Sequence, residues 1–200
     1  MKTLALRFRL VCAGLCAVVL AIGLGLAVGC SRDGGDEPSA PIDTALMAFL
    51  SQARALHHQA DLEEQNGNVE AAAAAMEKLV GGPRPHPGRP APEIDEVVAD
   101  AYARLAELEL KRGRVEAASR ATDRGLEHAP TATYFRGHLV EVQGIVAETN
   151  AATLADAGRS DEAAREREHA IRLLEEAVKI QEDVIRRSLE GRDAGKEAPR

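Results

Sequence analysis

The chain has 200 residues, and its 25 Lys and Arg stand against 32 Asp and Glu, which gives a formal net charge of −7. This acidic balance argues against nucleic acid as a partner, because a polyanion binds to a basic surface that releases its counterions. Aromatic residues make up only 2% of the chain, and good helix formers dominate it. We therefore expect an all-α protein.

Residues 1–29 have the organisation of a signal peptide. Lys2, Arg7 and Arg9 form a basic start, and residues 10–29 are uncharged and apolar, with small residues at the end. An apolar run of about 20 residues is also long enough to span a bilayer, so an uncleaved anchor helix is the alternative. The polar stretch that follows favours export and cleavage over a membrane span.

The end of this segment, Leu26-Ala27-Val28-Gly29-Cys30, resembles the lipobox of bacterial lipoproteins, although Ala27 stands where that family usually has Leu. The resemblance implies that a diacylglyceryl group is attached to the Cys30 thiol and that cleavage leaves Cys30 as the acylated first residue. Residues 30–43 are then a flexible tether. Ser31 follows Cys30, where an Asp would imply inner-membrane retention, so we expect an outer-membrane lipoprotein that faces the periplasm.

Cleavage changes the charge and the cysteine content of the chain. Residues 30–200 number 171, and removal of the three basic residues of the leader leaves 22 basic against 32 acidic side chains, a net charge of about −10. Cys12 and Cys16 are removed with the leader, so Cys30 is the remaining thiol. We therefore expect one domain without disulfides or a redox motif.

Apolar residues recur at helical spacing in six blocks, which predicts helices near 46–60, 69–80, 97–108, 115–126, 135–155 and 161–189. They fall within an expected helical domain at 44–190. The Pro-rich linker 81–92 separates the second block from the third, because proline removes backbone donors and fixes φ. We expect the charged tail 191–200 to be disordered.

Three similar segments mark corners between helices. Residues 66–72, around Gly67, are echoed by 112–118, around Gly113, and more loosely by 157–163, around Gly158. A glycine ends a helix readily because it adopts the left-handed conformation at little cost. An Ala lies five residues after each glycine and allows the second helix to approach the first. The pattern therefore predicts three antiparallel helix pairs.

Over most of residues 45–185 the chain resembles the tetratricopeptide repeat family. The middle copy matches best, with Leu105-Ala106, Gly113, Ala118, Gly125 and Pro130 at the family's spacing. The chain departs from the family in its longer period and in lacking the tyrosine of the first helix. The resemblance implies a right-handed stack of helix pairs with a long C-terminal helix, and a binding groove lined by the first helix of each pair. A generic helical bundle is the alternative.

No motif of enzyme chemistry occurs: the chain has no P-loop, dinucleotide-binding glycine motif, nucleophile elbow or HExxH sequence. His57 and His58 are adjacent and point about 100° apart on a helix, so they do not easily share a metal ion. His57 and Asp61 lie one helical turn apart, but two ligands make a weak metal site. His138 falls in an apolar stripe and is expected to be half-buried. We therefore expect no enzyme, no cofactor and no metal site.

The leading hypothesis is a membrane-anchored lipoprotein that acts as a non-catalytic scaffold in envelope or secretion assembly. By the resemblance, its groove presents mainly acidic side chains with apolar spots, and the third expected helix presents Asp100, Ala103, Glu107 and Leu110 to it. Such a groove suits a basic or amphipathic segment of a protein partner. The alternative is a self-associating structural spacer in the envelope, built from a generic helical bundle. The residues expected to bind the partner are Arg54, His57, Asp61, Glu64, Asp100, Glu107, Leu110 and Glu148.

Overall fold

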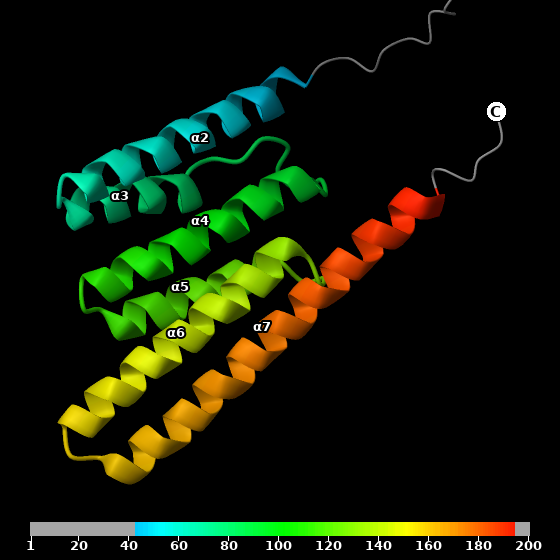
Figure 1. Ribbon diagram of the computed structural model, residues 1–200. Helices are drawn as coiled ribbons and strands as arrows, with labels where there is room; N and C mark the ends of the chain where they lie inside the picture. The colour runs from blue at the N-terminus through cyan, green and yellow to red at the C-terminus, as the bar shows by residue number, and fades with distance from the viewer. Residues whose placement is uncertain (1–42, 195–200) are drawn as a thin grey trace, which may run out of the picture. The chain divides into compact units, whose positions relative to one another are not determined.

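The computed structural model describes residues 43–194, and side chains as far as Gly191. The expected leader, Cys30 and the tether lie outside this part, as do residues 195–200. Within it, every regular element is a helix, so the all-α prediction is confirmed (Figure 1). The helices are α2 (Thr44–Gln65), α3 (Val69–Val80), α4 (Pro92–Lys111), α5 (Val115–His128), α6 (Tyr134–Asp156) and α7 (Ser160–Ala194).

The helix boundaries follow local chemistry at two points. Pro92 occupies the first turn of α4, where its missing N–H costs no hydrogen bond, and residues 81–91 form the non-helical connection that the prolines predict. At the other end of the chain, α7 continues to Ala194, past the end expected near Leu189. The boundary expected at residue 191 therefore lies inside a helix.

The three glycine corners have the same backbone structure. Gly67, Gly113 and Gly158 have φ values of +79°, +71° and +74°. In each corner, the N–H of the residue after the glycine donates to the carbonyl five residues before it, at distances of 2.7, 2.9 and 2.9 Å. This is the Schellman pattern, which uses a left-handed residue to end a helix. The sequence echoes therefore correspond to three equivalent turns.

Small side chains occupy the closest helix contacts. The Ala that follows each glycine by five residues is fully buried, as is the Ala seven residues before each glycine: Ala60, Ala72, Ala106, Ala118, Ala151 and Ala163. Gly125 of α5 lies against α4 and α6, since a Cβ placed there would meet Leu139 Cδ2 at 2.5 Å and Tyr102 Cβ at 2.9 Å. At these contacts Gly or Ala leaves room for the helices to approach closely.

The most extensive helix contacts are between α2 and α3, between α4 and α5, and between α6 and α7. Helix α4 also contacts both α2 and α3, and α6 contacts both α4 and α5 (Figure 1). No contact joins α3 to α5 or α5 to α7 within the described helices. Because α4 contacts both α2 and α6, these three helices lie in succession. None of the helices between residues 43 and 194 is long and apolar enough to cross a bilayer.

Candidate functional site: a charged face on three helices

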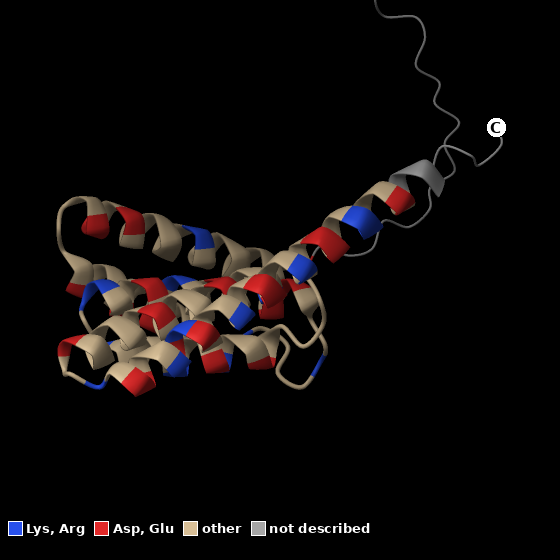
Figure 2. Cartoon of the chain, turned by 60° about the horizontal axis from the view of Figure 1, so that its bottom comes forward, with Lys and Arg blue, Asp and Glu red and all other residues tan. Residues whose placement is uncertain are grey.

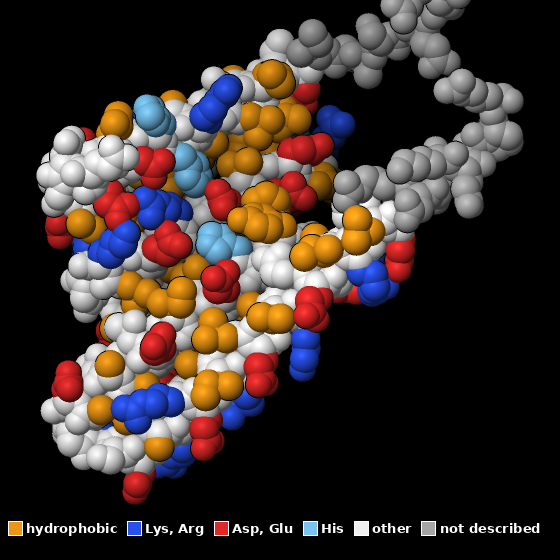
Figure 3. Space-filling view, in the orientation of Figure 1, with side chains coloured by type: hydrophobic (Ala, Val, Ile, Leu, Met, Phe, Trp, Pro, Cys, Tyr) orange, Lys and Arg blue, Asp and Glu red, His pale blue; other side chains and the backbone are white. Residues whose placement is uncertain are grey.

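Five of the eight residues expected to bind a partner come together on neighbouring helices. They are His57, Asp61 and Glu64 on α2 and Asp100 and Glu107 on α4. Each of these residues either forms an ion-pair contact with a residue of another helix or contacts a residue that does. With Arg104 and Lys111 of α4 and His138 of α6 they form what we call the three-helix face. Figure 3 shows this side of the molecule, where histidine side chains lie among acidic and basic ones.

The other three expected residues lie elsewhere. Arg54 is exposed on α2 and forms no ion pair with any residue in the described part of the chain. Leu110 is partly buried against the hydrophobic core, so it is not available as an apolar spot in a groove. Glu148 is exposed on α6 and lines a hollow beside α7. The expected set therefore divides into a cluster and three separate positions.

Arg104 is the centre of the three-helix face. Its Nη2 lies 3.0 Å from Asp61 Oδ1 and also contacts Glu64, and its Nη1 lies 3.0 Å from Glu107 Oε2. Lys111 Nζ contacts the other oxygen of Glu64. The Lys111 and Arg104 cations hold the pKa of Glu64 below its ordinary value. These contacts join α2 to α4 by charge-assisted hydrogen bonds.

His138 extends the network to α6. Its Nε2 lies 3.7 Å from Glu107 Oε1, and its Nδ1 lies 3.9 Å from Asp100 Oδ1. Its side chain is 25% exposed, in keeping with the half-buried position expected for it. Glu107 raises the pKa of His138 against the opposing effect of desolvation, and His138 together with Arg104 lowers the pKa of Glu107. Protonated His138 therefore stabilises the contact between α4 and α6.

Asp100 is the carboxylate with the weakest partners in this face. His57 of α2 lies 3.8 Å away on one side, and His138 of α6 lies 3.9 Å away on the other. Both distances exceed that of a hydrogen bond. The side chain is 39% exposed, so Asp100 can accept hydrogen bonds from a group outside the chain.

The face is less acidic than expected. Four carboxylates (Asp61, Glu64, Asp100 and Glu107) stand against the two cations of Arg104 and Lys111, and the cations are already paired. The expectation of a mainly acidic groove with apolar spots is therefore corrected to a largely paired network. Its residual negative charge is accessible at Asp100.

A second ionic cluster lies at the corner between α4 and α5 and was not anticipated. Glu109 is only 5% exposed, and its carboxylate lies 2.7 Å from Arg112 Nη1 and 3.0 Å from Arg114 Nε. Arg112 Nε also lies 3.5 Å from Glu70 Oε1 of α3. Because the cluster joins the corner to α3 and its central carboxylate, Glu109, is buried, we interpret it as a structural contact.

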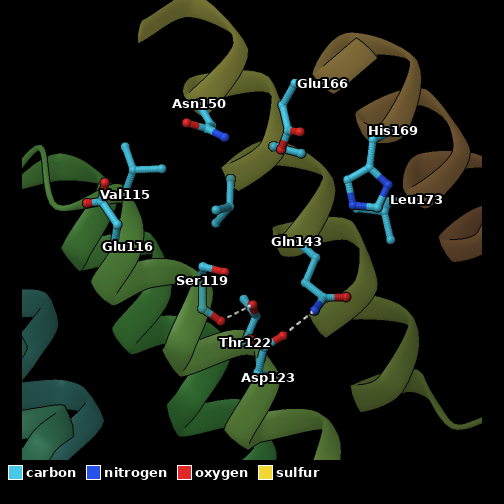
Figure 4. Close-up of a pocket in the computed structure, with 12 residues that line it drawn as sticks. Val115, Glu116, Ser119, Thr122, Asp123, Gln143, Asn150, Glu166, His169 and Leu173 are labelled. Atoms are coloured by element: carbon cyan, nitrogen blue, oxygen red, sulfur yellow. Dashed lines mark hydrogen bonds between the residues drawn. The ribbon is translucent and has the colours of Figure 1, made fainter. Parts of the chain in front are cut away.

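A groove of about 440 Å³ opens between α5 and α7, with α6 at its floor (Figure 4). Its lining is mixed: it includes polar side chains such as Glu116, Asp123 and His169 and apolar ones such as Val146 and Leu173. Gln143 Nε2 donates to Asp123 Oδ1 at 2.9 Å. Among the described residues no hydrogen bond or ion pair joins His169 to another side chain.

No metal centre is apparent between residues 43 and 194. There, no group of three or more His, Cys, Asp or Glu side chains is arranged to hold a metal ion. His57 and Asp61 lie one helical turn apart but do not pair with each other. Asp61 contacts Arg104, and His57 approaches Asp100. Both ligands of that weak candidate site are therefore engaged by other partners.

Sequence reasoning missed Arg104, Lys111 and His138 as members of the face. The expected face of α4 followed positions 100, 103, 107 and 110, whereas the observed one follows 100, 104, 107 and 111. Ala103 is instead fully buried. The available signal was the spacing of Arg104, which is four residues after Asp100 and three before Glu107 and suits ion pairs on one helix face.

Comparison with known proteins adds no assignment, since no model of a protein family and no curated protein sequence matches the chain.

Proposed function

We propose that the protein is a non-catalytic scaffold, anchored to a membrane by an N-terminal lipid, that holds a protein partner on the three-helix face. The observation that carries this proposal is the convergence of charged side chains from α2, α4 and α6 around Asp100. A polar surface held in place by several helices suits recognition, because its side chains are ordered before the partner arrives.

We propose a tetratricopeptide-repeat-like architecture of three antiparallel helix pairs in a right-handed stack. Three equivalent corners, with glycines at 67, 113 and 158, support a repeated unit. The contacts of α4 with both α2 and α3, and of α6 with both α4 and α5, support stacking of successive pairs. Stacked pairs of this kind present their first helices on one surface.

We propose anchoring through Cys30, which lies outside the described residues. The basic start, the apolar run and the Gly29-Cys30 junction support it, together with the polar stretch that follows. Several acyl chains give stable anchoring, since each buried methylene contributes about 0.8 kcal/mol. Ser31 supports an outer-membrane location that faces the periplasm.

The anchoring proposal is tested by labelling growing cells with radioactive palmitate. The wild-type chain should take up the label and sediment with membranes. Cys30→Ala should lose the label and either leave the membrane fraction or stay in the unprocessed form. Palmitate incorporation that persists in Cys30→Ala is incompatible with acylation at this cysteine.

The partner is proposed to be a basic or amphipathic protein segment. Asp100 is partly exposed and has only distant histidine partners, so a Lys or Arg of the partner gains a charge-assisted contact there without breaking an existing one. Glu107, Asp61 and Glu64 contribute negative potential nearby while they remain paired with Arg104.

Capture of the partner from crosslinked membranes tests this proposal. Asp100→Asn retains shape and removes the charge, and we expect it to weaken capture severalfold. The double reversal Asp100→Lys with Glu107→Lys should abolish capture. Glu127→Lys with Glu176→Lys is the matched control, because both glutamates are exposed and lie on α5 and α7, away from the three-helix face.

Circular dichroism of each variant separates lost binding from lost folding. Asp100→Asn should melt within a few degrees of the wild type, since Asp100 has no close ion pair to lose. If Asp100→Asn and the folded double reversal both capture the partner as well as the control does, the three-helix face is not the binding surface.

A further inference from the structure

Exposed apolar side chains are concentrated on α6 and α7. In the described part of the chain, most of the large hydrophobic residues that remain exposed belong to these two helices: Tyr134, Ile145, Ile171, Val178, Ile185 and Leu189, between 39% and 60% exposed. Ile171, Val178 and Ile185 are spaced by seven residues and so lie on one side of α7. Large exposed apolar side chains gathered on one side of a helix favour an interaction site there.

The apolar row of α7 continues inwards to the contact with α6. Leu174 lies against Gly144 of α6, where a Cβ would meet Leu174 Cδ2 at 2.9 Å. Ile171 and Leu174 line an open hollow of about 360 Å³ with Ala152 of α6. They also line a second hollow of about 590 Å³ with Val178. We call the surface formed by Ile171, Leu174, Val178 and Ile185 beside α6 the α6–α7 seam.

Acidic side chains border the α6–α7 seam on both of its helices. On α7 they are Glu168, Glu175 and Glu182, spaced by seven residues, and on α6 they are Glu141 and Glu148, also spaced by seven. All five are exposed, and none forms an ion pair with another described residue. Figure 3 shows acidic side chains beside the apolar ones along α6 and α7.

Two basic residues, Arg167 and Lys179, line the same hollows. Five glutamates against two cations leave the seam with a negative border. This differs from the three-helix face, where Asp61, Glu64 and Glu107 are already paired with Arg104 or Lys111. Away from the seam, acidic and basic side chains are interspersed over the helices (Figure 2).

We propose that the α6–α7 seam binds a basic amphipathic helix of a partner protein, with the apolar side of that helix on Ile171, Leu174, Val178 and Ile185. The inference rests on the proposed function, because it adds a docking surface for the partner of the same scaffold. A helix in an apolar groove with charged borders is an established mode of recognition, and opposite charges fix its register.

The dimensions and charge of the seam define this occupant. From Ile171 to Leu189 the apolar row extends about 27 Å at 1.5 Å per residue, which accommodates about five helical turns. A second copy of the chain is a poorer occupant, since two seams placed face to face bring their glutamates together. Basic side chains on both flanks of the incoming helix pair with Glu175 and Glu182 on one side and with Glu148 on the other.

A pair of synthetic peptides tests the inference on the full chain in phosphatidylcholine nanodiscs. Each peptide has about 20 residues, with leucines on one helical face, and carries either lysines or glutamates on both flanks. Fluorescence anisotropy should give a Kd at least about tenfold lower for the lysine peptide, after subtraction of binding to empty nanodiscs. Added salt should weaken that binding, as expected for a contact that depends on charge.

Two sets of variants locate the site. Glu175→Lys with Glu182→Lys should raise the Kd of the lysine peptide by about tenfold or more, and Ile171→Ser with Val178→Ser should weaken both peptides. The control Glu127→Lys with Glu176→Lys makes the same change of charge off the seam and should bind like the wild type. All these positions are exposed, so the variants should fold normally.

Equal affinity for the two peptides, or binding of the lysine peptide that survives Glu175→Lys with Glu182→Lys, overturns the inference. So does a dimer in sedimentation that Ile171→Ser with Val178→Ser dissociates, because a second copy then occupies the seam. Asp100→Lys separates this test from that of the proposed function. It should lose partner capture from membranes and keep peptide binding. Wild-type protein that binds the lysine peptide but captures no partner through the three-helix face would refute only the proposed function.

Discussion

Replacing Gly125 with Ala tests the close packing between α5 and its neighbours. The added methyl would lie 2.5 Å from Leu139 Cδ2 and 2.9 Å from Tyr102 Cβ. Leu139 is fully buried, and the Tyr102 contact is to a Cβ next to the backbone, so neither neighbour can move freely. Overpacking of this kind costs about 1–3 kcal/mol. The higher helix propensity of Ala returns about 1 kcal/mol, so we expect a net loss of up to about 2 kcal/mol.

Gly191→Ala is the matched control for this prediction. Gly191 is also helical, but a Cβ there has no neighbouring atom within 4 Å. The substitution should be neutral or stabilise the chain by up to about 1 kcal/mol. The difference between the two variants then isolates the packing term of α5.

Thermal unfolding followed by far-ultraviolet circular dichroism measures the effect. For a domain of this size, 1 kcal/mol corresponds to about 2–4 °C in Tm. Gly125→Ala should therefore melt several degrees below Gly191→Ala. If the two variants melt at the same temperature, α5 does not pack against α4 and α6 as closely as described.

Two further predictions concern the charged network. Arg104→Met removes the contacts of Arg104 with Asp61, Glu64 and Glu107. It should lower the free energy of unfolding in urea by about 1–2 kcal/mol. Arg159→Met, which loses an exposed partner, is the control, and an equal loss in the two variants would show that the network contributes little. The pKa of His138 is raised by Glu107, so its contact is fully present below the ordinary histidine pKa of about 6.5 and is lost as pH rises through the raised value. Conversely, Glu107 has a lowered pKa and contributes stability above the ordinary glutamate pKa of about 4.3, which is lost as pH falls through the lowered value. His138→Gln should therefore cost more stability near pH 6 than near pH 9, with Asp100 and Glu141 as the other carboxylates near the ring, and an equal cost at both pH values would contradict the pairing.

Much of the fold follows from local signals in the sequence. The glycines at 67, 113 and 158 predicted the three corners, because a left-handed residue is required there and few residue types adopt that conformation. Pro92 and the prolines before it predicted the interruption between α3 and α4. Such signals depend only on neighbouring residues, so they can be read without knowledge of the tertiary structure.

The candidate site depends on how helices pack, and only part of it could be predicted. The α2 positions His57, Asp61 and Glu64 were correctly placed on one face, since helical spacing alone determines which residues lie together. Whether α4 turned Ala103 or Arg104 towards that face depended on its packing against α2 and α6. The prediction that Ala103 faces the groove was wrong, because Ala103 is fully buried in the core. The groove between α5 and α7 was not predictable in this way, since it is lined by three helices and their relative packing decides which side chains meet there.

Site-directed photo-crosslinking in intact cells tests the scaffold role most directly. A photoreactive residue is placed at position 57 or 61, in the three-helix face, or at position 127 on α5 as the control. We predict one partner protein crosslinked from positions 57 and 61, absent at position 127 and lost when Asp100→Lys is added. Identical adducts from all three positions, or adducts unaffected by Asp100→Lys, would contradict a binding role for this face.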